Sequence, residues 1–214
     1  MRLNGRRTIV TGAASGIGRA IAMLFSSEGA KVVIADIDTD GGNSVAEEIL
    51  SSGGEALFVE TDVSCAGDVK SMVDKAYNFL TGIDILVNDA AAFVFGTVEE
   101  INSEDWEKVF GVNVLGSVNT VKESLPYLKA SEQPAIVNIA SVSSFIAQPA
   151  FVPYNTSKGA LLQLTRCLAM DLAADGIRVN CVSPGSIYTA ATERHIAFEG
   201  ADRDEFLKEA GEGS

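Results

Sequence analysis

The stretch Thr8-Ile9-Val10-Thr11-Gly12-Ala13-Ala14-Ser15-Gly16-Ile17-Gly18 decides the fold of this chain. It joins a short apolar strand to a helix through a turn that holds three glycines. Beyond the turn, apolar residues recur at spacings of three and four up to Gly29, which indicates a helix and its end. A second apolar strand follows at 31–35, and Asp36 stands directly after it. This order of strand, glycine turn, helix, strand and acid predicts a dinucleotide-binding unit.

The residues of this unit also favour one cofactor over another. Glycines let the backbone approach a pyrophosphate, whose charge lies against the N–H groups that begin the helix. A carboxylate at the position of Asp36 can accept hydrogen bonds from both ribose hydroxyls of NAD, and it repels the 2′-phosphate of NADP. Neither Ser15 nor Ile37 supplies a basic side chain that would neutralise that phosphate. The sequence therefore favours NAD(H) over NADP(H).

The alternation of strands and helices continues along the chain. Strands separated by helices predict a parallel sheet covered on both faces, so we expect a doubly wound α/β domain, a Rossmann fold, over residues 1–214. The expected elements are a helix at 42–52, a strand at 56–60, a helix at 68–79, a strand at 84–88, a long helix at 106–128 containing Asn113, a strand at 135–140, a helix at 154–174 and a strand at 178–182.

A second stretch of chemical interest runs from Ser141 to Lys158. Ser141 follows an apolar strand, and Tyr154 and Lys158 stand four residues apart, so they share one face of a helix. A phenol beside an ammonium group, with a hydroxyl delivered from a strand end, can transfer protons. These residues therefore indicate an enzyme that moves a hydride between a nicotinamide and a carbonyl or alcohol.

The composition narrows the function further. The 214 residues are 47% hydrophobic, which suffices for one domain with a sizeable core. The net charge is −13, and Arg6 and Arg7 form the one basic cluster, so we expect no nucleic-acid partner and no binding to an anionic membrane. No stretch is typical of a membrane span or a signal peptide. Three scattered cysteines and one histidine predict no metal site and a cytoplasmic protein.

Six motifs, taken in order, resemble the short-chain dehydrogenase/reductase family. They are Thr11-Gly12-x-x-x-Gly16-Ile17-Gly18, Asp62-Val63, Asn88-Asp89-Ala90-Ala91, Asn113, Ser141 with Tyr154 and Lys158, and Pro184-Gly185-x-Ile187-x-Thr189. The resemblance implies that Asn113, Ser141, Tyr154 and Lys158 are catalytic. It implies cofactor contacts for Gly12, Ser15, Gly16, Ile17, Gly18, Asp36, Asp62, Val63, Asn88, Tyr154, Lys158, Pro184, Gly185, Ile187 and Thr189.

The same resemblance implies a role for each catalytic residue. Tyr154 would be the acid in reduction and the base in oxidation, and Lys158 would lower the pKa of the phenol and hold the nicotinamide ribose. Ser141 would orient the substrate oxygen, and Asn113 would hold a water in the proton relay. Asp89 and Ala91 depart from the commoner Asn and Gly of the family, which changes the charge beside the cofactor.

The substrate is predicted less closely than the cofactor. Loops at the carboxyl ends of the strands carry apolar residues that suggest a pocket for a secondary alcohol or ketone, although a sugar, a polyol or an acyl thioester stays open. The candidate substrate residues are Phe93, Phe95, Phe145, Phe151 and, as a polar contact, Ser143, with Ile146 and Val152 in the same loops. We expect His195 to be a solvated loop residue.

The end of the chain and the function each leave alternatives open. Family members commonly continue with a further helix and strand. We therefore expect the last strand and helix of the family to be missing and residues 190–214 to begin a substrate-covering segment.

Two functions are alternatives to the NAD-dependent oxidoreductase. One is a catalytically silent nucleotide-binding or oligomer-forming protein. The other is a 3-oxoacyl-thioester reductase, which should prefer NADPH and so conflicts with Asp36. The resemblance also implies a homodimer or homotetramer formed through the helices at 106–128 and 154–174.

Overall fold

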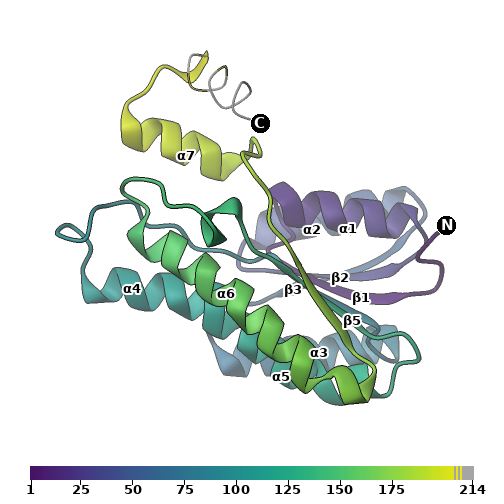
Figure 1. The fold of residues 1–214 in the computed structure, drawn as a ribbon. Coiled ribbons are helices and arrows are strands. Elements are labelled where there is room, and N and C mark those ends of the chain that lie inside the picture. The colour runs from purple at the N-terminus through teal and green to yellow at the C-terminus, as the bar shows by residue number, and fades with distance from the viewer. Residues whose placement is uncertain (205, 207, 209–214) are drawn as a thin grey trace.

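The computed structural model describes residues 1–204, 206 and 208, and Figure 1 shows their arrangement around one parallel sheet. The six strands of the described residues lie in the order β3-β2-β1-β4-β5-β6. Their bounds are β1 (Arg7–Thr11), β2 (Lys31–Asp36), β3 (Glu55–Glu60), β4 (Ile85–Asn88), β5 (Ala135–Ile139) and β6 (Arg178–Val182). The chain order reverses at β1 and β4, which is the doubly wound Rossmann arrangement. The predicted fold is confirmed.

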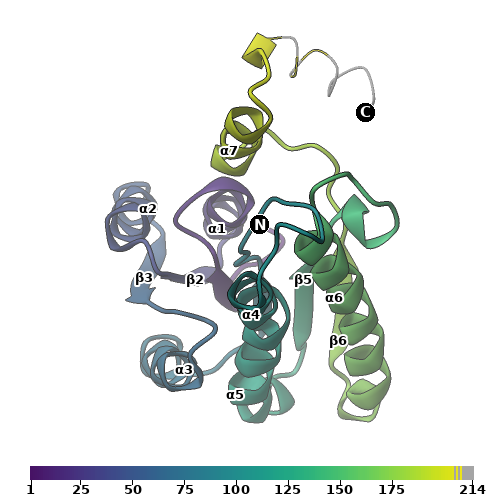
Figure 2. The same cartoon turned by 90° about the vertical axis from the view of Figure 1, so that its left-hand side faces the viewer.

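Helices cover both faces of the sheet, as Figures 1 and 2 show. One face carries α1 (Gly16–Ser27) and α2 (Thr39–Ser51), and the other carries α3 (Ala66–Leu80), α5 (Ser117–Lys129) and α6 (Val152–Asp171). Successive residues of a strand therefore pack into two different hydrophobic clusters, one on each face of the sheet. Ile9 packs with Met72 of α3, whereas Val10 packs with Ile49 of α2. Burial on both faces explains why the strands read as continuous apolar runs.

The helix expected at 106–128 is three segments in the structure. They are α4 (Ser103–Phe110), a π-helical segment η1 (Gly111–Gly116) and α5. The helix begins earlier than expected because Asn102 caps it. The side chain of Asn102 accepts a hydrogen bond from the backbone of Asp105, whose own side chain accepts one from the backbone of Asn102. The wide π turn contains Asn113, and such turns are frequent at functional sites.

The helix that carries Tyr154 also begins earlier than the expected residue. It starts at Val152, with Pro153 in its first turn, where the missing N–H of proline is no loss. Val152 therefore belongs to this helix and not to the loop before it. The helix ends at Asp171, and a short 3-10 turn, η3 (Ala173–Asp175), leads to Gly176 with a φ of 71°.

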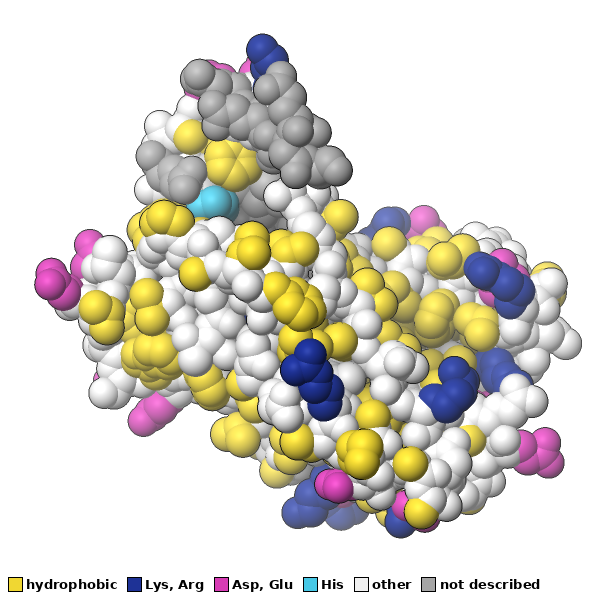
Figure 3. Space-filling view, viewed as in Figure 1, with side chains coloured by type: hydrophobic (Ala, Val, Ile, Leu, Met, Phe, Trp, Pro, Cys, Tyr) yellow, Lys and Arg dark blue, Asp and Glu magenta, His cyan; other side chains and the backbone are white. Residues whose placement is uncertain are grey.

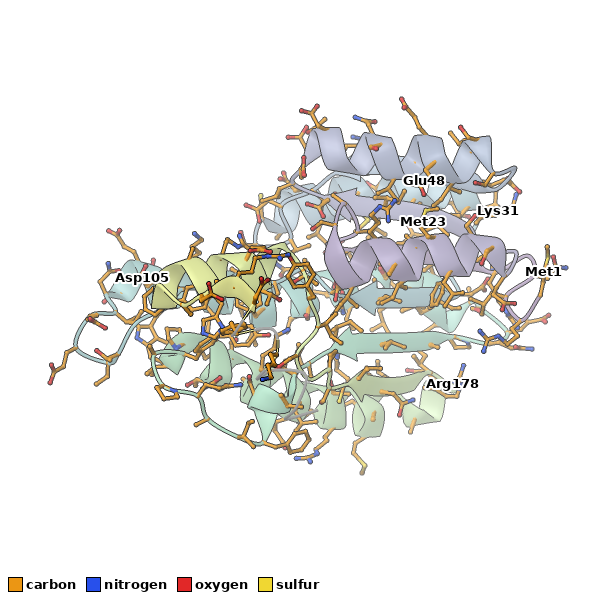
Figure 4. All side chains as sticks on the ribbon, turned by 90° about the horizontal axis from the view of Figure 1, so that it is seen from above. Met1, Met23, Lys31, Glu48, Asp105 and Arg178 are labelled. Carbon is orange, nitrogen blue, oxygen red and sulfur yellow. The ribbon has the colours of Figure 1, made fainter. Side chains whose placement is uncertain are left out.

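All strands point the same way, so the two ends of the sheet differ in content. Figure 4 shows Lys31 and Arg178, which begin β2 and β6, on the side of the molecule that holds Met1, whereas Asp105 of α4 lies on the opposite side. Helix α7 (Ala190–Glu199) also lies on that opposite side (Figure 1). Part of the predicted substrate-covering segment, residues 205, 207 and 209–214, lies outside the described residues. Among the described helices, none combines the length and the apolar character that crossing a membrane needs.

Candidate active site

A cavity of about 850 Å³ opens at the carboxyl ends of the strands. Parallel strands bring their carboxyl ends to one edge of the sheet, where ligands bind in this class of fold. Most of the predicted site residues meet there. The cavity is lined by Gly12, Ser15, Gly16, Ile17, Asp36, Asp62, Val63, Ser141, Tyr154, Lys158, Pro184, Gly185, Ile187 and Thr189.

The glycine turn fits the path that a dinucleotide requires. Gly12 and Gly16 adopt φ values of 67° and 56°, which favour glycine. A Cβ on Gly12 would lie 2.7 Å from the backbone nitrogen of Ala90, so the turn lies directly against the loop after β4. A Cβ on Gly18 would lie 2.3 Å from the carbonyl oxygen of Gly12. Gly18 therefore lets the turn close tightly. It is not among the residues that line the cavity, and its contact with the cofactor stays a prediction.

The start of α1 is prepared for an anion. Ser15 is the N-cap residue, yet its side chain makes no capping hydrogen bond, and the first turn of α1 holds no acidic residue. The first N–H groups of a helix have no partner within the helix and carry a partial positive charge. Because Ser15, Gly16 and Ile17 line the cavity, these groups can receive the pyrophosphate of a dinucleotide.

Asp36 stands at the end of β2, where the backbone holds its carboxylate in place. One carboxylate oxygen accepts a hydrogen bond from the backbone nitrogen of Ala14 at 2.9 Å, and the other accepts one from that of Asp38 at 3.0 Å. The carboxylate therefore joins the glycine turn to the rim of the cavity. The next residue, Ile37, is 70% exposed and brings no positive charge to this rim.

Tyr154, Lys158 and Ser141 form a buried polar group on the other side of the cavity. The Nζ of Lys158 donates a hydrogen bond to the carbonyl oxygen of Ile139 at 2.7 Å and lies 5.6 Å from the ring centre of Tyr154. The ring of Phe93 stacks on that of Tyr154 at 4.3 Å between centres. The phenol is therefore held between an aromatic ring, a lysine and Ser141, which lies two residues after the end of β5.

Burial sets the proton affinities of this group. It raises the pKa of Tyr154 to about 12, and a hydrogen bond from Ser141 opposes the rise. It lowers the pKa of Lys158 to about 8, which the charge of Asp89 opposes. Burial raises the pKa of Tyr154 because the phenolate is the charged form of tyrosine and loses its solvation. Stabilisation of the phenolate by Lys158 together with an oxidised nicotinamide stays a prediction.

Two predicted site residues lie behind the cavity wall. The side chain of Asn113 accepts a hydrogen bond from the backbone of Ala92 at 2.7 Å and donates one to the Oγ of Ser157 at 2.9 Å. The side chain of Asn88 donates to the side-chain oxygen of Asn138 at 2.9 Å. Both asparagines are buried. Asn88 therefore joins β4 to β5 through its side chain, and its predicted contact with the cofactor stays a prediction.

The predicted substrate residues divide into two groups. Phe93, Phe95, Phe151 and Ser143 line the cavity, and Phe95 meets Phe151 edge to face at 5.0 Å. Phe145 is 66% exposed and does not line the cavity, so the structure does not bring it together with the other predicted substrate residues. Its loop turns outward after the 3-10 turn η2 (Val142–Ser144), and Ile146 is exposed with it.

The expectation for His195 is also wrong. His195 belongs to α7, lines the cavity, and stacks on Phe95 at 5.5 Å between ring centres. Phe198 of the same helix stacks on Phe95 at 5.0 Å. Figure 3 shows histidine and hydrophobic side chains gathered where α7 meets the rest of the molecule. The one sequence signal for the contact of His195 with Phe95 is Phe198, an aromatic residue three positions later in α7.

Sequence reasoning missed several polar residues that line the cavity, namely Thr61, Lys108, Gln148, Ser186, Tyr188, Thr192 and Arg194. Of these, Gln148 lies nearest in sequence to the predicted substrate residues. It stands between Ser143 and Phe151 in sequence, and its side-chain oxygen accepts a hydrogen bond from the Ser143 hydroxyl at 3.1 Å. Asp89, noted above as a departure from the usual motif, also lines the cavity. Nothing in the local sequence distinguishes Gln148 from a solvated loop residue.

Comparison with known protein families identifies the family to which this fold belongs. A model of the short chain dehydrogenase family matches residues 6–199, which is most of the chain. The chain belongs to the short-chain dehydrogenase family. The predicted family membership is therefore confirmed, and with it the class of oxidoreductases that use a nicotinamide cofactor.

Individual members of the short-chain dehydrogenase family resemble the chain over most of its length. An uncharacterized oxidoreductase of Thermotoga maritima is 41% identical over 87% of this chain and 73% of its own length. A 3-oxoacyl-[acyl-carrier-protein] reductase of the same organism is 35% identical over 91% of this chain and 79% of its own. A short-chain dehydrogenase/reductase from Burkholderia phymatum in complex with NAD has a TM-score of 0.85 at 33% identity, covering 88% of this chain and 68% of that one.

Proposed function

We propose that this dehydrogenase transfers a hydride between NAD(H) and a secondary alcohol or ketone, with Tyr154 as the general acid and base. One observation carries the proposal. The phenol of Tyr154, the buried Lys158 and the hydroxyl of Ser141 lie in the same cavity as the glycine turn and Asp36. A cofactor held by the turn would therefore extend toward the group that transfers the proton.

Ser141 and Tyr154 would bind the substrate oxygen together. The Oγ of Ser141 accepts a hydrogen bond from the backbone nitrogen of Ser143 at 3.1 Å, and its hydroxyl is hydrogen-bonded to the phenol of Tyr154. A substrate oxygen would bind where these two hydroxyls meet. In reduction, Tyr154 gives its proton to the oxygen of the carbonyl as that oxygen becomes an alcohol. In oxidation, the phenolate takes the proton back. The nicotinamide, when bound, supplies or accepts the hydride.

Lys158 would help Tyr154 to form the phenolate near neutral pH. A phenol with a pKa of about 12 is a poor base near neutral pH, so catalysis of oxidation requires a lower value. Each unit of lowering corresponds to about 1.4 kcal/mol of stabilisation of the phenolate. The fixed ammonium of Lys158 can supply part of this stabilisation when bound substrate excludes water from the cavity, because charges interact more strongly in a dry site.

The choice of NAD over NADP rests on Asp36. Its carboxylate is fixed by two backbone N–H groups at the rim of the cavity, beside the exposed Ile37. A carboxylate in this place can accept hydrogen bonds from ribose hydroxyls and repels a 2′-phosphate. We therefore expect NADH to bind more tightly than NADPH by at least about tenfold, which is the effect of about 1.4 kcal/mol.

Two measurements on the full chain test the proposal. Titration with NADH and with NADPH, followed by cofactor fluorescence, checks the preference for NADH. Turnover of a panel of secondary alcohols and ketones by the unaltered chain and by Tyr154→Phe checks the chemistry. We expect the substitution to lower kcat by at least about 10²-fold and to leave the Kd for NADH within about twofold. Loss of NADH binding in Tyr154→Phe would contradict this assignment of roles.

A second candidate function is the reduction of a 3-oxoacyl thioester. It is favoured by the relative of that activity, which is 35% identical to this chain. It should require NADPH, so tight NADPH binding together with reduction of an acetoacetyl thioester would support it over the alcohol dehydrogenase. If NADH binds but no alcohol, ketone or thioester is turned over, a catalytically silent nucleotide-binding protein becomes the better description.

A further inference from the structure

A short hydrogen-bonded chain leads from the reacting end of the cavity to Gln148. Ser141 is the N-cap residue of η2, and its Oγ accepts a hydrogen bond from the backbone nitrogen of Ser143 at 3.1 Å. The hydroxyl of Ser143 donates to the side-chain oxygen of Gln148, also at 3.1 Å. Ser143 is buried, and all three residues line the cavity. The side chain of Gln148 is therefore held by Ser143, which is itself hydrogen-bonded to the serine that we assign to the substrate oxygen.

Packing also holds the backbone of Gln148. Its carbonyl oxygen accepts a hydrogen bond from the side chain of Asn155 at 3.3 Å, and Asn155 lies on α6 next to Tyr154. Gln148 is only partly exposed. Its side-chain oxygen is occupied by Ser143, whereas within the described part of the chain its Nε2 donates no hydrogen bond. One amide donor is thus fixed at the cavity wall without a protein partner.

The surroundings make this donor selective. The substrate end of the cavity is also lined by aromatic rings, with Phe93 stacked on Tyr154 and Phe95 against Phe151. Ligand pockets of this kind use a few placed polar groups to choose among apolar ligands. A ligand that cannot pair the donor leaves a polar group desolvated without a hydrogen bond, which lowers its affinity.

We propose that Gln148 is a specificity residue whose side-chain amide binds a second oxygen of the substrate, on the carbon next to the reacting one. The preferred substrates are then vicinal diols and α-hydroxy ketones with an apolar or aromatic substituent. The reacting oxygen lies between Ser141 and Tyr154, and the neighbouring oxygen lies toward Ser143 and Gln148. This inference rests on the proposed dehydrogenase function, since that function places the reacting oxygen at Ser141.

A matched pair of ligands tests the inference by binding. 1-Phenylethane-1,2-diol and 1-phenylethanol differ by one hydroxyl group. Their affinities are measured by calorimetry for Tyr154→Phe chains saturated with NAD⁺, so that no turnover disturbs the heat. The additional variants are Gln148→Leu and, as a control on the exposed face of α6, Gln163→Leu. We expect the diol to bind about 3- to 10-fold more tightly than the alcohol with Gln148 present, and equally with Gln148→Leu.

The outcomes separate this inference from the function on which it rests. Equal affinities with Gln148 present, or a preference that survives Gln148→Leu, would overturn the role of Gln148. Binding of neither ligand would overturn the substrate site as assigned. Turnover of the two ligands is measured separately with the Tyr154 protein. Absence of turnover together with a diol preference that depends on Gln148 counts against the dehydrogenase and not against this site.

Discussion

At the scale of single residues, Asp89 is the most consequential departure from the motifs of the family. It lines the cavity, and its carboxylate lies against Gly18, with one oxygen 2.7 Å from where a Cβ of that glycine would be. Burial raises the pKa of Asp89 to about 6, with a further rise from the charge of Asp36, while Lys158 and the N–H of Gly18 oppose it. Asp89 in turn raises the pKa of Tyr154. The charge in the site therefore changes just below neutral pH.

This position predicts a pH dependence of cofactor binding. NADH brings two phosphate charges to the glycine turn, so we expect its Kd to fall as the pH drops through about 6 and Asp89 becomes neutral. Asp89→Asn should bind NADH on the order of 3- to 10-fold more tightly at pH 8 and lack this step. Fluorescence titration between pH 5 and 8 measures both proteins. Parallel pH profiles would show that Asp89 is not the group involved, since Asp36 is common to both.

The same residue predicts a pH dependence of stability. The pKa of Asp89 is higher in the folded chain than the ordinary 3.8, so the folded state binds the proton more tightly. The contribution of Asp89 to stability is therefore largest below pH 4 and is lost as the pH rises through 6. We expect Asp89→Asn to raise the free energy of unfolding at pH 7 by about 2–3 kcal/mol and to flatten its decline between pH 4 and 7. Urea unfolding at several pH values measures this difference.

At the scale of elements, α7 completes the substrate end of the cavity. It contacts the wall through rings, with His195 edge to face on Phe151 at 4.7 Å and Phe198 stacked on Phe95 at 5.0 Å. Apart from Ile196, the described side chains of α7 remain at least partly exposed. Because most of the described side chains of α7 stay partly exposed, we expect this helix to open locally at low cost, which suits a segment that substrate must pass.

Removing one of these rings should weaken the binding of substrate and leave the binding of cofactor unchanged. Phe198→Ala removes one stacked ring from Phe95, so α7 would close less well over a bound substrate. We expect KM to rise by about 3- to 10-fold, the effect of roughly 0.5–1.5 kcal/mol for an aromatic pair, with little change in the Kd for NADH. Steady-state kinetics and cofactor titration measure the two quantities. A weakened NADH affinity of similar size would place α7 on the cofactor instead.

At the scale of the whole molecule, an apolar hollow on the outside of α4 and η1 favours a second copy of the chain. Trp106, Phe110 and Leu115 line it, and Leu115 is 55% exposed. The neighbouring Val118 of α5 is 36% exposed. Contiguous apolar surface of this kind is typical of protein interfaces. We therefore propose a homodimer through α4 and α5.

A charge at the centre of that hollow should separate the copies. We expect Leu115→Glu to shift the chain from dimer to monomer in sedimentation velocity, because an unpaired carboxylate would be buried at the interface. Leu50→Glu on α2 is a control, since Leu50 is 53% exposed and lies far from the hollow in sequence. A monomer for the unaltered chain, or equal effects of the two substitutions, would contradict this interface.

The sequence by itself determined the fold and the cofactor end of the site. The spacing of apolar residues identified all six strands, and the glycine turn and Asp36 are local motifs whose shape depends on neighbouring residues. Thirteen of the fifteen predicted cofactor residues line the cavity. Such features are readable because backbone conformation at glycines, helix starts and strand ends is set within a few residues.

Only the tertiary structure decided which side chains face the cavity and how strongly they hold protons. Asn88 and Gly18 belong to family motifs, yet neither lines the cavity. Phe145 is exposed to solvent, whereas Gln148 and His195 line the cavity. The pKa of Tyr154 rises although Lys158 is near. Burial depends on segments that meet from distant parts of the chain, such as the loop at Phe93 and helix α7. No pattern within a single segment reports that packing, so the substrate end of the site becomes visible only in the folded molecule.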